Sequence, residues 1–182
     1  MPGRLTEWKG QEVLIESLNF LKTNFGYKNF VAIILGSDQG RDAYKKKLIR
    51  LVEQHRLNDE VIFLEHANSM PVAYSIANVV VSASIEPEAF GRVSVEAQSM
   101  KRPIIASDIG GSKETIIDNR TGLLFKSEDP KSLSEKIDNI FRSDDTTLNA
   151  MGNSGRKNVE QKFNVEKMCF STYSEYKKLI NA

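Results

Sequence analysis

The sequence predicts an α/β protein built on a doubly wound parallel sheet, with helices on both faces. Short runs of β-branched and aliphatic residues alternate along the chain with longer segments in which apolar residues recur every three or four positions. The length of 182 residues, with 40% hydrophobic and 27% charged residues, is typical of one globular domain. We therefore expect a single domain over residues 1–182.

In the first half, the helix at 12–25 is predicted because Leu14, Leu18 and Leu21 fall on one helical face. The run from Phe30 to Leu35 is apolar throughout and ends at Gly36, which is typical of a strand buried on both faces. The same reasoning predicts a helix at 41–55, a strand at 61–64 and a short helix at 70–77.

The second half is predicted to begin with a strand at 78–83, an acidic loop and a helix at 91–100. A strand at 103–106, a short helix opening at 110–112 and a strand at 123–125 follow, and then helices at 130–141, 148–163 and 165–180. In parallel sheets of this kind, ligands bind outside the carboxyl ends of the strands. We therefore expect the loops at 36–40, 84–91 and 108–112 to meet at one edge.

The most informative stretch is the acidic segment from Glu86 to Glu96. Glu88 precedes the predicted helix at 91–100, and Glu96 lies one to two turns inside it. Carboxylates accept hydrogen bonds from hydroxyl groups, and the free N–H groups of a helix start bind phosphate. The segment therefore suits a sugar joined to a nucleotide. Taken alone, Glu88 and Glu96 could equally be a loop acid that favours the helix dipole and an exposed helix residue.

Arg4 and Lys9 could together neutralise a diphosphate, because one offers a planar fork of donors and the other a point charge. Their spacing alone favours the simpler interpretation of two solvated cations. The Gly110-Gly111-Ser112 turn resembles a phosphate loop, but it lacks the lysine of a P-loop and is more typical of a tight strand-to-helix turn.

Composition excludes several classes of function. The net charge of +1 gives no electrostatic case for a nucleic-acid partner. No apolar run approaches the roughly 20 residues of a membrane span, and the first residues lack the apolar core of a secretory signal. The single cysteine, Cys169, excludes an internal disulfide. We expect a cytoplasmic protein, and Lys45–Lys47, which most simply form a solvated helix face, leave open a peripheral contact with an anionic inner membrane face.

Together these segments resemble the C-terminal half of a family-four, or group 1, retaining glycosyltransferase with the two-domain GT-B architecture. The matching motifs are Gly-Arg-Leu-Thr-Glu-Trp-Lys-Gly at 3–10, Ile-Leu-Gly at 34–36, Val-Ile-Phe-Leu at 61–64, Glu-Ala-Phe-Gly-Arg-Val-Ser-Val-Glu-Ala at 88–97, Arg-Pro-Ile-Ile-Ala-Ser-Asp-Ile-Gly-Gly at 102–111 and Thr-Gly-Leu-Leu-Phe at 121–125. Their order covers nearly the whole chain and implies a Rossmann-like, nucleotide-sugar-binding domain.

The resemblance implies a role for each matching residue. Arg4 and Lys9 become the clamp for the donor diphosphate, Glu88 the acceptor of donor-sugar hydroxyls and Glu96 the acceptor of ribose hydroxyls. Backbone groups of Phe90, Gly91, Arg92 and Val93 are expected to face the sugar and phosphates. The nucleobase is expected near Gly36 and the segment that begins at Phe63. The family uses no metal or other cofactor, and the sequence carries no Asp-x-Asp signature.

The implied reaction moves a hexose from a nucleoside-diphosphate sugar to an acceptor hydroxyl, in surface polysaccharide, lipopolysaccharide or glycolipid synthesis. The acceptor-binding N-terminal domain is not among these residues, so the isolated domain is expected to be inactive or nearly so. The helix at 165–180 would then have an exposed apolar face or pair between chains. Two alternatives stay open: one half of a nucleotide-sugar epimerase, and a noncatalytic nucleotide-binding or interaction module. The sequence departs from relatives at Lys101, where glycine is common.

Overall fold

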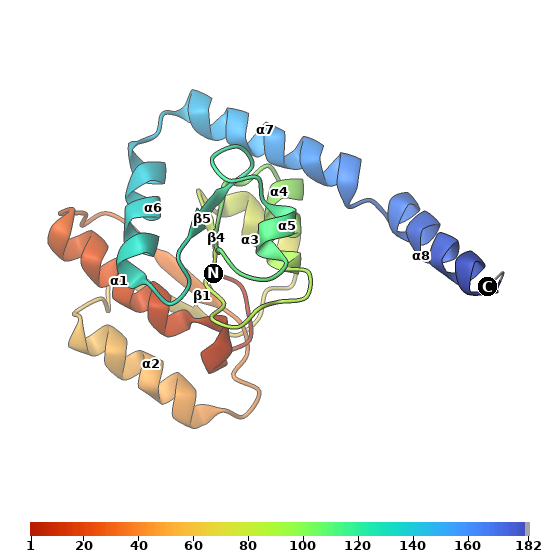
Figure 1. Cartoon of the computed structure of the whole chain (residues 1–182). Coiled ribbons are helices and arrows are strands. Elements are labelled where there is room, and N and C mark those ends of the chain that lie inside the picture. Colours follow the sequence, from red (N-terminus) through yellow and green to blue (C-terminus); the bar gives the residue numbers. More distant parts are fainter. Residues whose placement is uncertain (181–182) are drawn as a thin grey trace.

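The computed structural model describes residues 1–180 as an α/β protein with parallel strands, which confirms the predicted fold class (Figure 1). The strands are β1 (Ala32–Leu35), β2 (Val61–Leu64), β3 (Val80–Ser82), β4 (Ile104–Ser107) and β5 (Leu123–Phe125). The helices are the 3₁₀ turn η1 (Glu7–Lys9), α1 (Gln11–Asn24), α2 (Asp42–Gln54), α3 (Met70–Ile76), α4 (Arg92–Ser99), α5 (Ser112–Thr115), α6 (Pro130–Arg142), α7 (Asp145–Lys162) and α8 (Val165–Ile180).

Two hydrophobic layers cover the two faces of the strands. Successive strand side chains point to opposite faces, so Val81 and Ile105 join the layer formed with α1, α2 and α6, while Val80 and Ile104 join the smaller layer formed with α3 and α4. Figure 1 shows these two groups of helices on opposite sides of the strands. This arrangement is the doubly wound pattern that the sequence predicts.

The strands form two separate pieces rather than one continuous sheet. β1 pairs with β2 from Ala32 opposite Val61 to Leu35 opposite Leu64. β4 lies between β3 and β5, and all of these pairings are parallel. The sequence could not predict this division, because strand pairing depends on residues far apart in the chain.

The first strand is shorter than predicted. β1 begins at Ala32 rather than at Phe30, and the side chain of Val31 is 62% exposed. The prediction that the whole run would be buried on both faces was therefore wrong at its start. Among residues 1–180, β1 pairs with β2 on one edge, and its other edge carries only the bridge of Pro2 with Leu35, so the start of the run is left uncovered.

The N-terminal residues act as the link between the two pieces. Met1–Gly3 runs along β1, with Gly3 N–H donating to Leu35 O at 2.8 Å and a single parallel bridge between Pro2 and Leu35. Further along, Gly10 packs on the backbone of Ala83, at the end of β3. These first ten residues therefore contact both pieces of the sheet.

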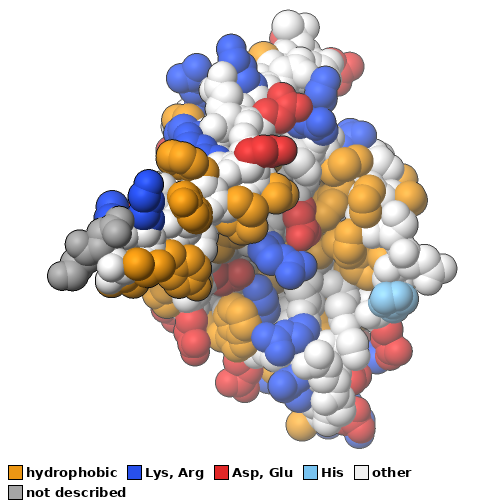
Figure 2. All heavy atoms as spheres, turned by 90° about the vertical axis from the view of Figure 1, so that its right-hand side faces the viewer, with side chains coloured by type: hydrophobic (Ala, Val, Ile, Leu, Met, Phe, Trp, Pro, Cys, Tyr) orange, Lys and Arg blue, Asp and Glu red, His pale blue; other side chains and the backbone are white. Residues whose placement is uncertain are grey.

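The two C-terminal helices differ in how they pack. α7 lies along α4, where the buried side chain of Asn158 donates to Gln98 Oε1 at 3.2 Å. α8 projects away from the body and has no buried residue (Figure 1). Its apolar side chains are exposed in the single chain: Val165, Met168, Phe170, Tyr173, Tyr176, Leu179 and Ile180. That they pair between chains stays a prediction. Figure 2 shows hydrophobic surface gathered on this projecting part of the molecule.

Candidate functional site

Glu88 and Lys9 form the centre of the candidate site. Lys9 Nζ lies 2.8 Å from Glu88 Oε1, and both side chains are mostly buried, at 13% and 17% exposed. Ser84 Oγ donates to the same carboxylate oxygen. Among the described residues, no hydrogen bond reaches the second oxygen, Oε2. The pair therefore presents a fixed carboxylate with one oxygen free to accept a hydrogen bond.

Backbone contact at Gly10 brings Lys9 to Glu88 across 79 positions of sequence. Gly10 has φ of 71°, and a Cβ built on it would lie 1.9 Å from Ala83 O. Ile85 N–H also donates to Trp8 O at 2.8 Å. The absence of a side chain at Gly10 lets the η1 turn sit directly on the end of β3, so Lys9 can reach the acidic loop.

The Gly110-Gly111 turn braces the same loop from the other side. Gly111 N–H donates to Glu88 O at 2.7 Å, and a Cβ on Gly111 would lie 2.5 Å from the carbonyl carbon of Phe90. The sequence interpretation of this turn as a tight strand-to-helix connection was correct. The structure adds that the turn holds the acidic loop in place, since any larger residue would push the loop away.

The start of α4 supplies the third element of the site. Gly91 is its N-cap, with φ of 74° and no side-chain capping bond, and α4 begins at Arg92. The first N–H groups of a helix have no partner within the helix, so those of Arg92 and Val93 are available to a ligand. Phe90, next to this helix start, packs edge-on against Phe163 with ring centroids 5.6 Å apart.

Glu96 is held differently from Glu88. Tyr74 Oη, on α3, donates to Glu96 Oε2 at 2.7 Å, and Arg92 Nε lies 3.4 Å from Oε1. Burial, and then the hydrogen bond to Glu96, raise the pKa of Tyr74, so this phenol stays protonated and keeps donating. The structure thus directs Glu88 toward η1 and Glu96 toward α3, on either side of the helix start.

The other predicted site residues lie around this centre. Arg4 is exposed, and its backbone carbonyl accepts a bond from Gln11 Nε2. Gly36 N–H donates to Leu64 O at 2.8 Å, which places Gly36 beside the segment that begins at Phe63. The Phe63 side chain packs against the larger core layer, so only its main chain is left to contact a base.

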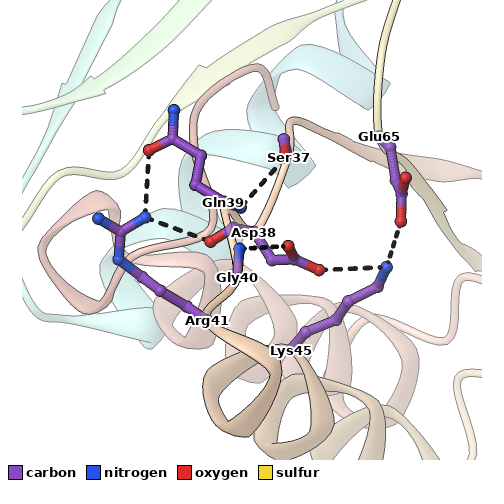
Figure 3. A network of polar contacts seen from close by, with 7 residues as sticks. All are labelled: Ser37, Asp38, Gln39, Gly40, Arg41, Lys45 and Glu65. Carbon is purple, nitrogen blue, oxygen red and sulfur yellow. Dashed lines mark hydrogen bonds and ion pairs between the residues drawn. The ribbon is translucent and has the colours of Figure 1, made fainter.

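A polar network closes the loops after β1 and β2 (Figure 3). Lys45 Nζ lies 2.6 Å from Glu65 Oε1 and 3.5 Å from Asp38 Oδ2. Asp38 also caps its own turn, because Gly40 N–H donates to Asp38 Oδ1 at 3.0 Å. Lys47 pairs with Glu12. Two lysines of the basic run at 45–47 are therefore engaged by acids rather than forming a free cationic face.

Sequence reasoning missed two residues of the site. Ser84 directly follows the predicted strand and precedes Glu88 by four positions, and this placement is a signal that could have identified it. Tyr74 lies on the short helix α3, 22 positions before Glu96. No local pattern marks Tyr74, because its contact depends on how α3 and α4 pack.

Two properties of the described residues bear on the wider predictions. Within residues 1–180, no group of three or more His, Cys, Asp or Glu side chains is arranged to hold a metal ion. In the same part of the chain, none of the helices has the length and apolarity needed to cross a bilayer. That the chain uses no metal remains a prediction.

Figure 2 shows basic and acidic side chains meeting at the centre of the face that carries α8.

Comparisons with known proteins agree with this arrangement. The family model "Glycosyl transferases group 1" matches residues 1–158. A capsular polysaccharide biosynthesis glycosyltransferase, CapM, from Staphylococcus aureus is 30% identical over 161 residues, covering 88% of this chain and 40% of that protein.

Solved structures are similar over nearly the whole chain. A glycosyltransferase from Rickettsia africae has a TM-score of 0.90 and 31% identity, covering 99% of this chain and 47% of that one. The Anabaena protein HepE, solved in complex with UDP-glucose, has a TM-score of 0.86 and 25% identity, covering 96% of this chain and 47% of that one. The chain thus spans less than half the length of these relatives.

Proposed function

This chain belongs to the glycosyl transferases group 1 family, and we propose that it is the donor-binding domain of a retaining hexosyltransferase. In the proposed reaction, a hexose passes from a nucleoside-diphosphate sugar to an acceptor hydroxyl with retention of its anomeric configuration. The Glu88–Lys9–Ser84 cluster at the start of α4 carries the proposal. The cluster combines a fixed carboxylate with a cation, and the loop that carries Glu88 leads into the free N–H groups of α4.

Each part of the cluster suits one part of such a donor. The free Oε2 of Glu88 can accept a hydroxyl of the sugar, while the N–H groups at the start of α4 and the ammonium of Lys9 can together neutralise a diphosphate. Arg4, exposed on the same N-terminal segment, supplies a second cation. Positive groups placed at the leaving diphosphate stabilise the charge that develops as the glycosidic bond breaks.

Glu96 is proposed to accept the ribose hydroxyls. Tyr74 holds one of its oxygens, and the Glu96 side chain is 38% exposed, so its carboxylate can still accept hydrogen bonds from a diol. The base is proposed to lie against the main chain near Gly36 and Phe63–His66. The complex of HepE with UDP-glucose supports a nucleotide-sugar ligand for this class of domain.

The proposal extends to the whole reaction. The acceptor is proposed to bind a second, N-terminal domain, so that residues 1–182 alone bind donor but turn over little or none of it. CapM, by its name, acts in capsular polysaccharide synthesis, which supports a surface glycan, lipopolysaccharide or glycolipid as the product. We place the reaction in the cytoplasm, with a peripheral contact at the inner membrane face when the acceptor is a lipid.

Calorimetric titration of uridine-, guanosine- and adenosine-diphosphate sugars tests the proposal. One donor should bind saturably, and Lys9→Ala should weaken its binding by roughly 10- to 100-fold, because a charge-assisted contact is worth about 1.5–3 kcal/mol. Glu96→Ala should also weaken binding. Lys126→Ala, a matched loss of an exposed lysine, should leave binding unchanged.

Saturable binding that neither Lys9→Ala nor Glu96→Ala alters would contradict the proposed donor site and would favour a noncatalytic binding module. Failure of every nucleotide sugar to bind would contradict the proposal as a whole.

A further inference from the structure

The side chain of Lys9 follows a defined path to the acidic loop. Its stem passes beside Gly3, where a Cβ would lie 3.5 Å from Lys9 Cδ and 3.7 Å from Lys9 Cγ. Its ammonium ends 2.8 Å from Glu88 Oε1. A lysine side chain that is held in one conformation loses rotamer entropy, so its contacts have to offset that cost.

The ring of Trp8 is a second partner of the Lys9 ammonium. Lys9 Nζ lies 4.3 Å from the centroid of the Trp8 ring, within the roughly 6 Å over which a cation and an aromatic face attract each other. Trp8 directly precedes Lys9 in the η1 turn, is partly buried, and is the single tryptophan of the chain. Among aromatic side chains, tryptophan attracts cations most strongly. The ammonium therefore lies against both a carboxylate and an aromatic ring.

The backbone of Trp8 is bonded to the loop that carries Glu88. Ile85 N–H donates to Trp8 O at 2.8 Å. The η1 turn then ends at Gly10, which packs on the backbone of Ala83. The residue that supplies the ring and the loop that supplies the carboxylate are thus held together by the main chain.

The two partners of the ammonium differ in charge. Glu88 carries a negative charge, whereas the face of the Trp8 ring attracts a cation through its quadrupole and has no net charge. An ammonium has several N–H donors, and among residues 1–180 the hydrogen bond of Lys9 Nζ goes to Glu88. Trp8 can therefore hold Lys9 in place without adding a second negative charge beside an approaching diphosphate.

We propose that Trp8 is a positioning residue of the donor site, whose ring holds the Lys9 ammonium where it can contact Glu88 and the donor diphosphate together. The inference rests on the proposed donor function and adds a residue that acts through Lys9 rather than on the ligand. Without the ring, the Lys9 side chain samples more rotamers, and fixing it on the phosphates costs more entropy. Binding of a nucleoside diphosphate accordingly depends on Trp8 only while Lys9 is present.

A double-mutant cycle of Trp8→Leu and Lys9→Met tests this dependence. The ligand is UDP, or the nucleoside diphosphate that the donor screen selects, and calorimetric titration measures its affinity for the full chain. Trp8→Leu alone should weaken binding by about threefold to tenfold, the range of a partly desolvated cation–π contact. In the Lys9→Met background, the same change should weaken the remaining binding less than about twofold, because the coupled partner is absent.

Two further variants separate the aromatic face from other properties of Trp8. Trp8→Phe keeps a ring that attracts cations less strongly, so it should restore part of the affinity that Trp8→Leu loses. Tyr173→Leu, a matched loss of an exposed aromatic side chain on α8, should leave binding unchanged. Urea unfolding of each variant checks that it is folded under the conditions of the titration.

The contact between Trp8 and Lys9 can also be measured without a ligand. In proton NMR spectra, the ring current of Trp8 should move the signals of the Lys9 ε-methylene group upfield of their positions in Trp8→Leu. Signals that do not differ between the two proteins would contradict the contact itself, whatever the chain binds.

The titrations distinguish failure of this proposal from failure of the donor function. An equal loss from Trp8→Leu in both Lys9 backgrounds would overturn the role of Trp8, because the ring would then act independently of Lys9. A loss from Trp8→Phe as large as that from Trp8→Leu, or no loss from either, would overturn it as well. If the unaltered chain binds no nucleoside diphosphate, the donor function is contradicted, and the role of Trp8 in donor binding falls with it.

Discussion

The two pieces of the sheet differ in how completely they are built. In the three-stranded piece, β4 is paired on both edges, and the side chains of Ile104 and Ile105 are fully buried. Among the described residues, β1 and β2 pair with each other and gain only the single bridge of Pro2 with Leu35, and Ile62 and Leu64 on β2 are more than 40% exposed. The loop with Glu88 follows β3, which belongs to the three-stranded piece. The position of Glu88 therefore depends on the piece of the sheet that has more strand pairing.

The N-terminal segment connects the two pieces and also carries Lys9. Its first residues extend the edge of β1, and Gly10 fixes its far end on β3. Since an isolated two-stranded sheet is marginal on its own, this segment links the stability of the weaker piece to the geometry of the donor site.

The largest effect is expected where Gly10 meets the end of β3. Gly10→Ala should lower the free energy of unfolding by about 3–4 kcal/mol, because left-handed strain adds to overlap with Ala83 O. Gly26→Ala is the matched control, since Gly26 has φ of 76° with no atom near the new Cβ, and it should cost about 1 kcal/mol. Urea unfolding measures both. Equal costs would show that the contact between η1 and β3 is not tight.

The free energy of unfolding should depend on pH through the amino group of Met1, which donates to Ile33 O on β1. The pKa of this amine falls from 8.0 in the unfolded chain to about 5 in the folded one, so the unfolded state binds the extra proton between those values. Stability should therefore rise as the pH is raised from 5 to 8, with a gain of about 2 kcal/mol between pH 6 and pH 8. The measurement uses protein with Met1 confirmed by mass spectrometry.

Acetylation of the Met1 nitrogen should remove this part of the pH dependence, because no titrating amine is left. A slope that survives acetylation would assign the effect to other groups.

The smallest effect on stability is expected at Lys101, beside the three-stranded piece. Lys101 follows the end of α4 with φ of 57°. Lys101→Gly should raise the free energy of unfolding by about 0.5–1 kcal/mol, because the left-handed conformation costs glycine nothing. Lys101→Ala keeps the Cβ and should bring no gain. Thermal unfolding of the three proteins would detect the difference, and a gain with alanine would contradict this explanation.

Local patterns predicted the elements well and their assembly less well. Apolar periodicity placed α1 and β2 within a residue or two of their observed bounds, since this signal lies within a few neighbouring positions. The gap between β1 and β3 and the contact of Tyr74 with Glu96 could not be predicted in this way. Both depend on packing between distant segments. The meeting of Lys9 with the acidic loop was expected only through the family resemblance.

The most direct test of the proposed donor site is a titration that separates the sugar from the nucleotide. UDP and UDP-glucose, or the donor pair that the screen selects, would be titrated into the chain, Glu88→Gln and the neighbouring control Glu86→Gln. We predict that Glu88→Gln weakens binding of the nucleotide sugar at least tenfold and leaves the bare nucleotide unchanged or tighter, because Lys9 is then released to the phosphates. Glu86→Gln should change neither. Equal loss of both ligands with Glu88→Gln, or no loss at all, would contradict the role of Glu88 in holding the sugar.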